Sequence, residues 1–430
     1  MLLCLFEDPS VVGLRPLVET RATYALRLGG RTVLETTRDA FAPDALLLHV
    51  RPALARVTGQ AHPDRPVNRL PDEADVLFVN GRFVAGDGPA TAQIRGHVPD
   101  GDARVFVRDD EIVAAWLPDA ARRLPDGALA DGPLAPALFS ALPATPLPSA
   151  RLLAYPWDLL DGLGDTIRRD IRTRTDGPAD APLPARPHAT VHESVSTVRP
   201  ERVHLRPDST VKPGAVLNAE NGPVLLDEGA TVHERAVVKG PCYVGPTSEI
   251  KVGADLDTSA FGYWCKVGGE VHDSVLHSLS NKAHPGFLGH AYLGRWCNLG
   301  ADTNNSNLKN DYGPVSAYAP AEDAFVNTGR QFAGLFMGDH SKCGINTMFN
   351  TGTVVGTFCN VYGGDFPPRY LPPFSWGSPG TGFGTYRLSK ALSVAERVLG
   401  RRDTPFTEAD EALLSHLHET TAAERRAHHD

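Results

Sequence analysis

Lysine is absent from the first 150 residues of this 430-residue chain, which holds 42 Lys and Arg against 51 Asp and Glu. The net charge of -9 argues against a general nucleic-acid binder, which would need a basic surface. Long apolar runs are also missing: the best candidate, residues 45–50, is far shorter than the ~20 residues that cross a membrane. Glu7 and Asp8 stand where a secretory leader would be basic, so we expect a cytoplasmic protein.

Cysteine motifs are missing as well. The six cysteines form no CxxC pair and show no Cys/His spacing typical of zinc; they are Cys4, Cys242, Cys265, Cys297, Cys343 and Cys359. We expect reduced, mostly buried thiols, with a catalytic thiol as the alternative. A GxxxxGK[ST] loop is absent, and the glycines of residues 380–384 lack the spacing of a dinucleotide site, which argues against an ATPase or a dehydrogenase.

A six-residue repeat dominates the second half of the chain. Apolar residues recur at steps of six, in four runs: Leu205, Val211 and Leu217; Leu226, Val232, Val238, Val244, Ile250 and Leu256; Phe287, Leu293 and Leu299; Met337, Cys343, Phe349, Val355 and Val361. This period fits neither an α-helix nor an ordinary strand. Glycine follows many of these residues, as in Val244-Gly245 and Leu293-Gly294, and permits a tight corner. Three hexapeptides then form one triangular coil of a parallel β-helix.

Composition divides the chain into four parts. Residues 1–150, with short apolar runs at 75–80 and 104–107, predict an α/β or mixed sheet with long surface connections at 118–150. Residues 151–187 predict a connecting helix at 157–172 and a Pro- and Ala-rich linker at 176–187. The β-helix takes residues 188–365, and residues 366–430 form an extension with helices near 386–399 and 408–428.

The β-helix carries a specific polar string. EVHDSVLHSLSNKAHPGFLG followed by HAYLGRWCNLGADTNNSNLKN resembles the acetyltransferase half of bacterial bifunctional enzymes that make UDP-N-acetylglucosamine. The resemblance covers most of residues 200–365 and implies that the β-helix is left-handed, an exception to the usual right-handed crossover. It also implies acetyl-CoA as cosubstrate and a homotrimer with acetyl-CoA bound between subunits.

The same resemblance assigns the site residues. His284 falls on the catalytic general base, a role that suits an imidazole near neutral pH, and Asn298 and Asn307 fall on asparagines near sugar and CoA. The alternatives are a turn histidine without a task and a stacked asparagine ladder.

Two cations of that family's phosphate site are changed. Lys251 replaces an arginine and His272 replaces a lysine, while Phe287 replaces a tyrosine. Lys282 and Lys309 could compensate, or be solvated surface charge. These differences bear on which sugar is the acceptor. The insertion at residues 302–336 follows the site and could cap the acceptor pocket.

The N-terminal half resembles sugar nucleotidyltransferases. The string LRPLVETRATYALRLGGRTVLE, from Leu14, aligns with their signature L-R-P-L-T-x-x-R-P-K-x-L-x-x-x-G-G-K-P-x-x-E, and Trp157-Asp158-Leu159 matches a helix that leads into the β-helix of fused members. The phosphate-binding glycines are replaced by Glu7-Asp8-Pro9-Ser10, and the signature lysine aligns with Thr23.

The expected metal ligand of that family is replaced too. Arg82 stands where the family has the aspartate that holds Mg²⁺, and a cation cannot ligate magnesium. Either Arg15, Arg21 and Arg31 form a rearranged triphosphate site, with Mg²⁺ required, or the domain has reduced or lost nucleotidyl transfer; we favour the second.

Three functions therefore compete. The leading hypothesis is acetyl-CoA-dependent N-acetylation of an amino-sugar 1-phosphate, similar to glucosamine-1-phosphate, with a nucleotidyltransferase-like N-terminal domain. A zinc hydratase similar to γ-class carbonic anhydrase is a rival, because His272, His277, His284 and His290 lie close together in sequence. A trimeric scaffold that binds sugar nucleotide without turnover is the other, and it predicts that His284→Ala changes nothing.

Overall fold

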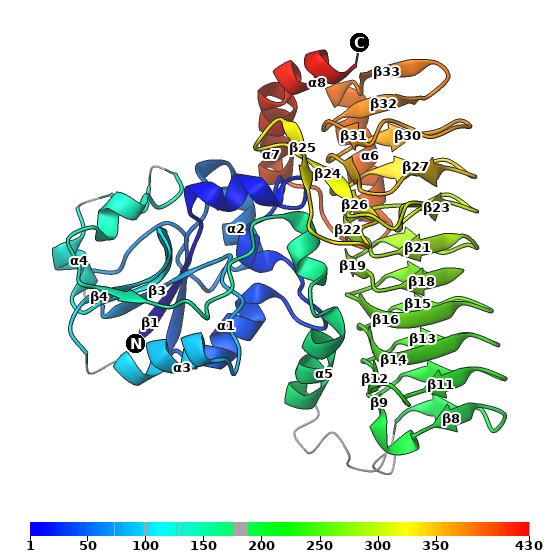
Figure 1. Ribbon diagram of the computed structural model, residues 1–430, viewed down its shortest axis with the longest axis horizontal. Coiled ribbons are helices and arrows are strands. Elements are labelled where there is room, and N and C mark those ends of the chain that lie inside the picture. Colours follow the sequence, from blue (N-terminus) through cyan, green and yellow to red (C-terminus); the bar gives the residue numbers. More distant parts are fainter. Residues whose placement is uncertain (73, 99–100, 126, 131, 175–187, 430) are drawn as a thin grey trace.

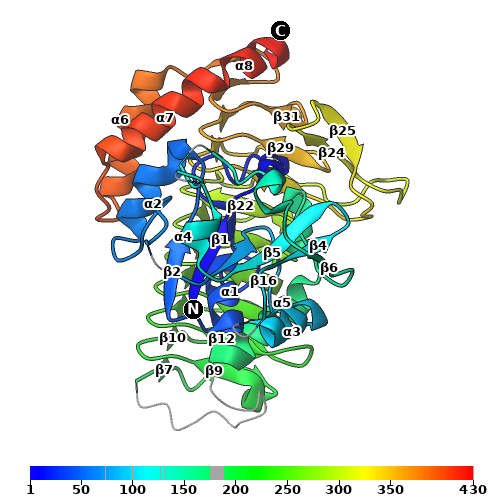
Figure 2. The same ribbon diagram turned by 90° about the vertical axis from the view of Figure 1, so that its left-hand side faces the viewer.

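The computed structural model describes residues 1–72, 74–98, 101–125, 127–130, 132–174 and 188–429. An N-terminal α/β domain lies against one side of a tall parallel β-helix, and C-terminal helices lie beside its last coils (Figures 1 and 2). The α/β domain and the left-handed β-helix expected from the sequence are confirmed. The linker expected at residues 176–187 lies outside the described residues. In the part of the chain that is described, no helix has the length and apolar character needed to cross a membrane.

The N-terminal domain is built on a mixed six-stranded sheet of order β2-β1-β3-β5-β4-β6, in which β5 is antiparallel to both of its neighbours. Its strands are β1 (Leu2–Phe6), β2 (Ala45–Leu48), β3 (Val76–Asn80), β4 (Arg104–Arg108), β5 (Glu111–Leu117) and β6 (Ala144–Pro146). Its helices are α1 (Val33–Phe41), α2 (Ala55–Ala61), α3 (Pro89–His97) and α4 (Ala120–Arg123). The apolar run of β1 and residues 76–79 of β3 are buried on both faces, as a central strand requires.

The sequence suggested that residues 118–150 form surface connections, but this segment also contributes to the sheet and to the core of the domain. It carries α4 and the edge strand β6, and Leu129, Leu134 and Phe139 are buried under the sheet. The connecting segment contains a 3₁₀ turn at Pro156–Leu160 and α5 (Leu163–Arg174). Trp157 is buried there against Phe336 of the β-helix.

The β-helix has three faces, each made of parallel strands from successive coils. Face 1 contains β7 (Thr190–Val191), β10 (Thr210–Val211), β13 (Thr231–Val232), β15 (Glu249–Ile250), β17 (Lys266–Val267), β20 (Asn281–Lys282), β27 (Lys342–Cys343), β30 (Asn360–Val361) and β32 (Ser375–Ser378), to which β33 (Gly382–Thr385) adds antiparallel. Face 2 contains β8 (Ser196–Val198), β11 (Val216–Asn218), β18 (Glu270–His272), β21 (Phe287–Gly289), β23 (Asn304–Asn305) and β28 (Met348–Phe349). Face 3 contains β9 (Val203–Leu205), β12 (Val224–Leu226), β19 (Val275–Ser278), β22 (Tyr292–Arg295), β26 (Leu335–Met337), β29 (Thr353–Val355) and β31 (Tyr370–Leu371). Two long strands, β14 (Val237–Val244) and β16 (Asp255–Phe261), run through the corner from face 2 to face 3.

The apolar residues of the hexapeptide repeat stack into one column inside the coils. The run from Leu226 to Leu256 is fully buried in it, as predicted. Phe287 is an exception: Leu288 takes the inward position and Phe287 lies outside. Five of the six cysteines join this core, and all six are free and buried. Burial raises the pKa of the Cys265 thiol to about 11, which favours the predicted structural role over a nucleophilic thiolate.

Face 3 is also apolar on its outer side, where it packs against the N-terminal domain. Leu225, Tyr243, Tyr292 and Phe336 belong to one buried cluster with residues of that domain. Polar contacts cross the same boundary, since the Arg27 guanidinium donates to the carbonyl of His277 (3.2 Å). The two domains therefore share a core.

The insertion and the C-terminal extension pack on the same side of the β-helix. The insertion forms a hairpin of β24 (Ser316–Ala319) and β25 (Ala324–Asn327). Arg330, which follows the hairpin, pairs with Asp158 of the connecting segment (2.7 Å). The extension forms α6 (Leu388–Gly400), α7 (Glu408–Thr420) and α8 (Ala422–His428), so the second predicted helix is two helices. They pack on their own chain, between face 3 and α2.

Candidate functional site

His284 lies at the corner between faces 1 and 2, in the turn that joins β20 to β21. Its side chain is exposed, and no hydrogen bond or ion pair is made by its imidazole within the described part of the chain. Its backbone is closely packed: a Cβ on Gly269, in the coil before, would lie 2.9 Å from the His284 carbonyl oxygen. A free imidazole is thus presented on a fixed turn.

Lys282 is not the substrate contact or solvated charge that the sequence suggested. It occupies an inward position of β20, is 1% exposed, and stacks in register with Val267 of β17. Its ammonium donates to the carbonyls of Gly268 (3.1 Å), His284 (2.6 Å) and Pro285 (3.2 Å). Burial lowers the pKa of Lys282 to about 8. The residue therefore holds the His284 turn from inside and cannot reach a ligand outside.

Lys251 follows β15 at the same corner, two coils before His284. Its ammonium pairs with Glu249 (2.9 Å), which also pairs with Lys266 (3.0 Å). Burial works against ionisation of Glu249, but the bonds from these lysines prevail and lower its pKa to about 2. Two ammonium groups share one carboxylate, so a net positive charge is left for an anion.

A polar cluster covers the adjoining part of face 2. His272 and Phe287 are in contact (ring centroids 5.9 Å apart), and the Nε2 atom of His272 is buried without a hydrogen-bond partner among the described residues. Asn307 Nδ2 lies 3.0 Å from His290 Nδ1. His290 also stacks on Phe332, so residues near both ends of the insertion reach the cluster.

His290 belongs to this cluster, although the sequence suggested it only as a ligand in the zinc hypothesis and not as a contact for sugar or CoA. The six-residue period did not mark it, because β18 and β21 place Gly289, not His290, in register with His272. The His290 amide donates to the His272 carbonyl, as stacked coils require. Burial lowers the pKa of His290, which favours its neutral form as a hydrogen-bonding group.

The two remaining predicted contacts lie apart from this cluster. Asn298 is on face 1, in register with Asn281 and Lys342, and its side-chain oxygen accepts from Asn281 (3.3 Å). Asn298 therefore fits the alternative interpretation, a stacked ladder of asparagines. Lys309 is partly exposed in the insertion and pairs with Asp311 (3.0 Å).

The four histidines of the zinc hypothesis do not gather within one subunit. His277 lies on face 3, fully buried, with Nε2 2.8 Å from the carbonyl of Ala25 in the N-terminal domain. Over the described residues, no three His, Cys, Asp or Glu side chains are grouped so that they could hold a metal ion.

The carboxyl ends of β1 and β3 in the N-terminal domain are filled by internal ion pairs. Asp8 accepts from the Arg82 guanidinium with both oxygens (2.9 and 2.6 Å), and Asn80 donates to the same carboxylate (2.9 Å). Glu7 is fully buried and pairs with Arg51 (3.0 Å). Because Asp8 is already saturated and Arg82 is a cation, these residues do not fit a magnesium ion.

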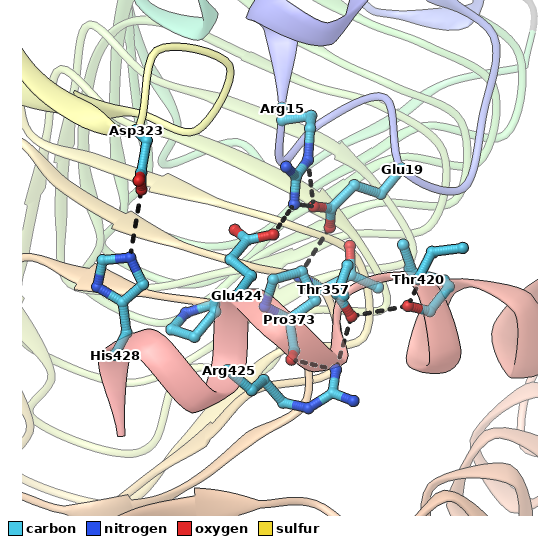
Figure 3. Close-up of polar contacts among 12 residues, drawn as sticks. Arg15, Glu19, Asp323, Thr357, Pro373, Thr420, Glu424, Arg425 and His428 are labelled. Carbon is cyan, nitrogen blue, oxygen red and sulfur yellow. Dashed lines mark hydrogen bonds and ion pairs between the residues drawn. The ribbon is translucent and has the colours of Figure 1, made fainter. Parts of the chain in front are cut away.

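The three arginines expected to form a triphosphate site do not converge. Arg15 pairs with Glu19 (3.1 Å) and with Glu424 of α8 (2.8 Å), as Figure 3 shows. Arg31 pairs with Asp170 of α5 (3.0 Å).

The third arginine, Arg21, pairs with Asp339 of the β-helix. Arg15 and Arg21 therefore bind carboxylates of the C-terminal extension and of the β-helix, at the boundaries of the N-terminal domain. Arg31 binds a carboxylate of α5. The rearranged triphosphate site is not formed.

Comparison with known proteins agrees with this architecture. Residues 3–178 match the sequence model of a family described as sugar nucleotidyl transferase. This segment covers the N-terminal domain, β1 to α5, and the resemblance expected from the sequence is confirmed for it.

The curated relatives that match are described as bifunctional proteins. A bifunctional sugar-1-phosphate nucleotidylyltransferase/acetyltransferase of Sulfurisphaera tokodaii is 30% identical over 95 residues, which cover 22% of this chain and 23% of that protein. The bifunctional protein GlmU of Rippkaea orientalis is 30% identical over 127 residues (27% of each chain), and that of Methanocaldococcus jannaschii 32% over 90 residues (21% of each). The chain thus spans about a quarter of the length of the curated relatives it matches.

Solved structures were matched at low similarity. The polySia specific acetyltransferase NeuO covers 50% of this chain and 96% of its own, with 12% identity and a TM-score of 0.23. The Arabidopsis UDP-N-acetylglucosamine acyltransferase covers 56% of this chain and 91% of its own, with 13% identity and a TM-score of 0.20.

Proposed function

We propose that the β-helix transfers an acetyl group from acetyl-CoA to the amine of an amino-sugar 1-phosphate of the glucosamine-1-phosphate type. The observation that carries the proposal is His284: its imidazole is exposed, has no partner in the described part of the chain, and lies on a turn held from inside by Lys282. The bifunctional nucleotidyltransferase/acetyltransferase relatives support the reaction class.

The acetyl transfer requires one general base. The sugar amine must lose a proton as its nitrogen bonds to the thioester carbonyl carbon, and the carbon–sulfur bond then breaks to release CoA. A neutral imidazole accepts that proton near pH 7, where a lysine is already charged and a carboxylate is too weak a base. His284 would then return the proton to the leaving thiolate.

Substrate recognition follows from the charges along the corner. Lys251 and Lys266 share Glu249, so a phosphate placed there would meet a net positive charge. On face 2, His272 and Asn307 offer hydrogen-bonding groups for sugar hydroxyls, and Phe287 offers an apolar edge in place of a hydroxyl.

For the N-terminal domain we infer that nucleotidyl transfer has been lost. The Asp8–Arg82 pair supports this, because it occupies the strand ends at which the sugar nucleotidyltransferase fold places phosphate and metal. The domain then serves as a docking element for face 3, with which it shares a core.

We further propose that the site is completed in a homotrimer. Val252 and Ile345 are exposed apolar residues at the same corner as His284, 52% and 69% accessible respectively. Apolar side chains beside a half-open site are typical of a surface that another subunit covers.

The test is CoA release from acetyl-CoA with glucosamine-1-phosphate and a panel of related amino sugars. We expect turnover in the wild type and a loss of about 10²-fold or more in His284→Ala, the range of general-base catalysis. His192→Ala is the matched control, since His192 is an exposed histidine at the same corner of an earlier coil. No CoA release with any sugar would refute the acetyltransferase and favour the scaffold. UTP or dTTP turnover by the same preparation would refute the loss of nucleotidyl transfer.

A further inference from the structure

A cavity of about 340 Å³ lies where the three parts of the chain meet. Its walls come from the loop at residues 20–25 and from α2 of the N-terminal domain, from two turns of the β-helix, and from residues 399–414 of the C-terminal extension. The volume is within the range of small-molecule sites in proteins. Glu7, Asp8 and Arg82, at the strand ends of the N-terminal domain, do not line it.

The cavity contains two guanidinium groups and one buried carboxylate. Arg21 pairs with Asp339 through Nη2, and Thr20 donates to the same carboxylate (2.7 Å). The second oxygen of Asp339 accepts from the backbone amide of Arg295 (2.7 Å). Asp339 is therefore saturated, and the side chain of Arg295 adds a positive charge that this carboxylate does not neutralise.

Several donors in this cavity lack a partner within the described residues. Arg295 lines the cavity with an exposed side chain, and its guanidinium makes no hydrogen bond or ion pair with the described residues. Arg21 is 5% exposed, and its Nε and Nη1 atoms are unpaired. The Tyr24 hydroxyl, on a side chain that is 1% exposed, is also unpaired. Unpaired buried donors are costly, so the buried atoms of Arg21 and Tyr24 indicate a missing acceptor, and Arg295 adds an exposed cation beside them.

The ionisation of the lining residues is also consistent with a site for an anion. The Arg295 side chain is exposed to the cavity, but desolvation by the surrounding protein, together with the charge of Arg21, lowers its pKa to about 10. Burial also lowers the pKa of His340, another lining residue, to about 3, so its ring is neutral. The second lining carboxylate, Asp410, is engaged in capping α7 through the amide (2.9 Å) and hydroxyl (2.7 Å) of Thr407.

We propose that this cavity binds a small organic phosphate, a phosphomonoester whose terminal oxygens accept from Arg21, Arg295 and Tyr24. Three separate donor groups match the three terminal oxygens of a phosphomonoester better than the two of a carboxylate. The lining also includes the apolar side chains of Trp296, Phe406 and Leu414, which suit a ring or carbon chain on the phosphate.

Such a ligand would contact all three parts of the chain at once. Its binding free energy would therefore stabilise the docking of the N-terminal domain and of the C-terminal helices on the β-helix. This site does not depend on the acetyltransferase proposal, because neither His284 nor Lys251 lines the cavity.

The test uses phenyl phosphate, which has no amine and so cannot accept an acetyl group, with benzoate as the carboxylate probe. Binding is measured by titration calorimetry on the full chain at low ionic strength, where charge contacts are least screened. We expect phenyl phosphate to bind the wild type, and Arg295→Gln to weaken it by about tenfold or more, the value of a charged hydrogen bond. Arg38→Gln, which removes an exposed arginine of the N-terminal domain that does not line the cavity, should leave the affinity unchanged.

The controls separate the outcomes. Because the Arg295 guanidinium has no hydrogen bond or ion pair with the residues that the structure describes, Arg295→Gln should unfold at the same temperature as the wild type without ligand. Tyr24→Phe is a second variant, expected to weaken binding by a smaller factor. Absence of binding to the wild type, or equal affinity in Arg295→Gln, would overturn the proposal. Equal affinity for benzoate would overturn the phosphate assignment.

Discussion

Replacing Lys282 by methionine should change how the stability of the protein depends on pH. The methionine keeps the length of the side chain but has no group that titrates. In the folded chain the pKa of Lys282 is about 8, below its ordinary value of 10.5, because the ammonium is buried. Between these two values the unfolded chain binds more protons than the folded chain, so the free energy of unfolding rises with pH in this window.

The magnitude follows from the shift. From pH 7 to pH 10 the folded lysine loses its proton almost completely while the unfolded one keeps most of it, which is roughly 2–3 kcal/mol at 1.36 kcal/mol per pH unit. The difference between the unfolding free energies of wild type and Lys282→Met should therefore grow by that amount. Other groups titrate in both proteins and cancel in the difference.

Urea unfolding followed by tryptophan fluorescence at pH 7 and at pH 10 measures this difference. Lys309→Met is the control, because Lys309 is partly exposed and its removal should give the same difference from wild type at both pH values. A Lys282→Met difference that does not change with pH would refute a buried, carbonyl-bound ammonium.

Two further predictions concern stability at pH 7. Arg82→Met leaves the carboxylate of Asp8 buried without its partner and should lower the free energy of unfolding by about 3–5 kcal/mol in urea titrations; a change under 1 kcal/mol would contradict the buried pair. Gly262→Ala would place a Cβ 1.8 Å from the carbonyl oxygen of His277 in the next coil, so we expect a loss of at least about 2 kcal/mol in thermal unfolding, and an unchanged midpoint would contradict the close approach of the coils.

The β-helix could be predicted because its inward positions are few and regularly spaced. The period fails between Leu256 and Leu288, where corners shorten and the inward residues are no longer six apart. Lys282 takes one of these inward positions, and hydrophobic periodicity cannot identify a charged residue as part of a core. The neighbouring carbonyls that accept its protons are visible only in three dimensions.

The candidate site was predictable in part for a similar reason. His284 could be placed because the polar string around it is specific, whereas Arg15 and Arg21 were assigned to a nucleotide. Their partners, Glu424 and Asp339, are more than 300 residues away in sequence, so no local signal separates an arginine that meets a ligand from one that meets a distant carboxylate. The outer apolar side of face 3 was a missed signal for domain docking.

The two ends of the β-helix differ in how they are covered. All three residues of β8, in the first coil, are exposed, whereas the last coil is closed by β33 and held by α8, where Arg425 donates to the carbonyl of Pro373 (3.2 Å). In a stack in which each coil is supported by its neighbours, opening begins at the less supported end. Amide hydrogen exchange should therefore spread from residues 190–205 upward, and the coils that carry His284 should open only after those before them.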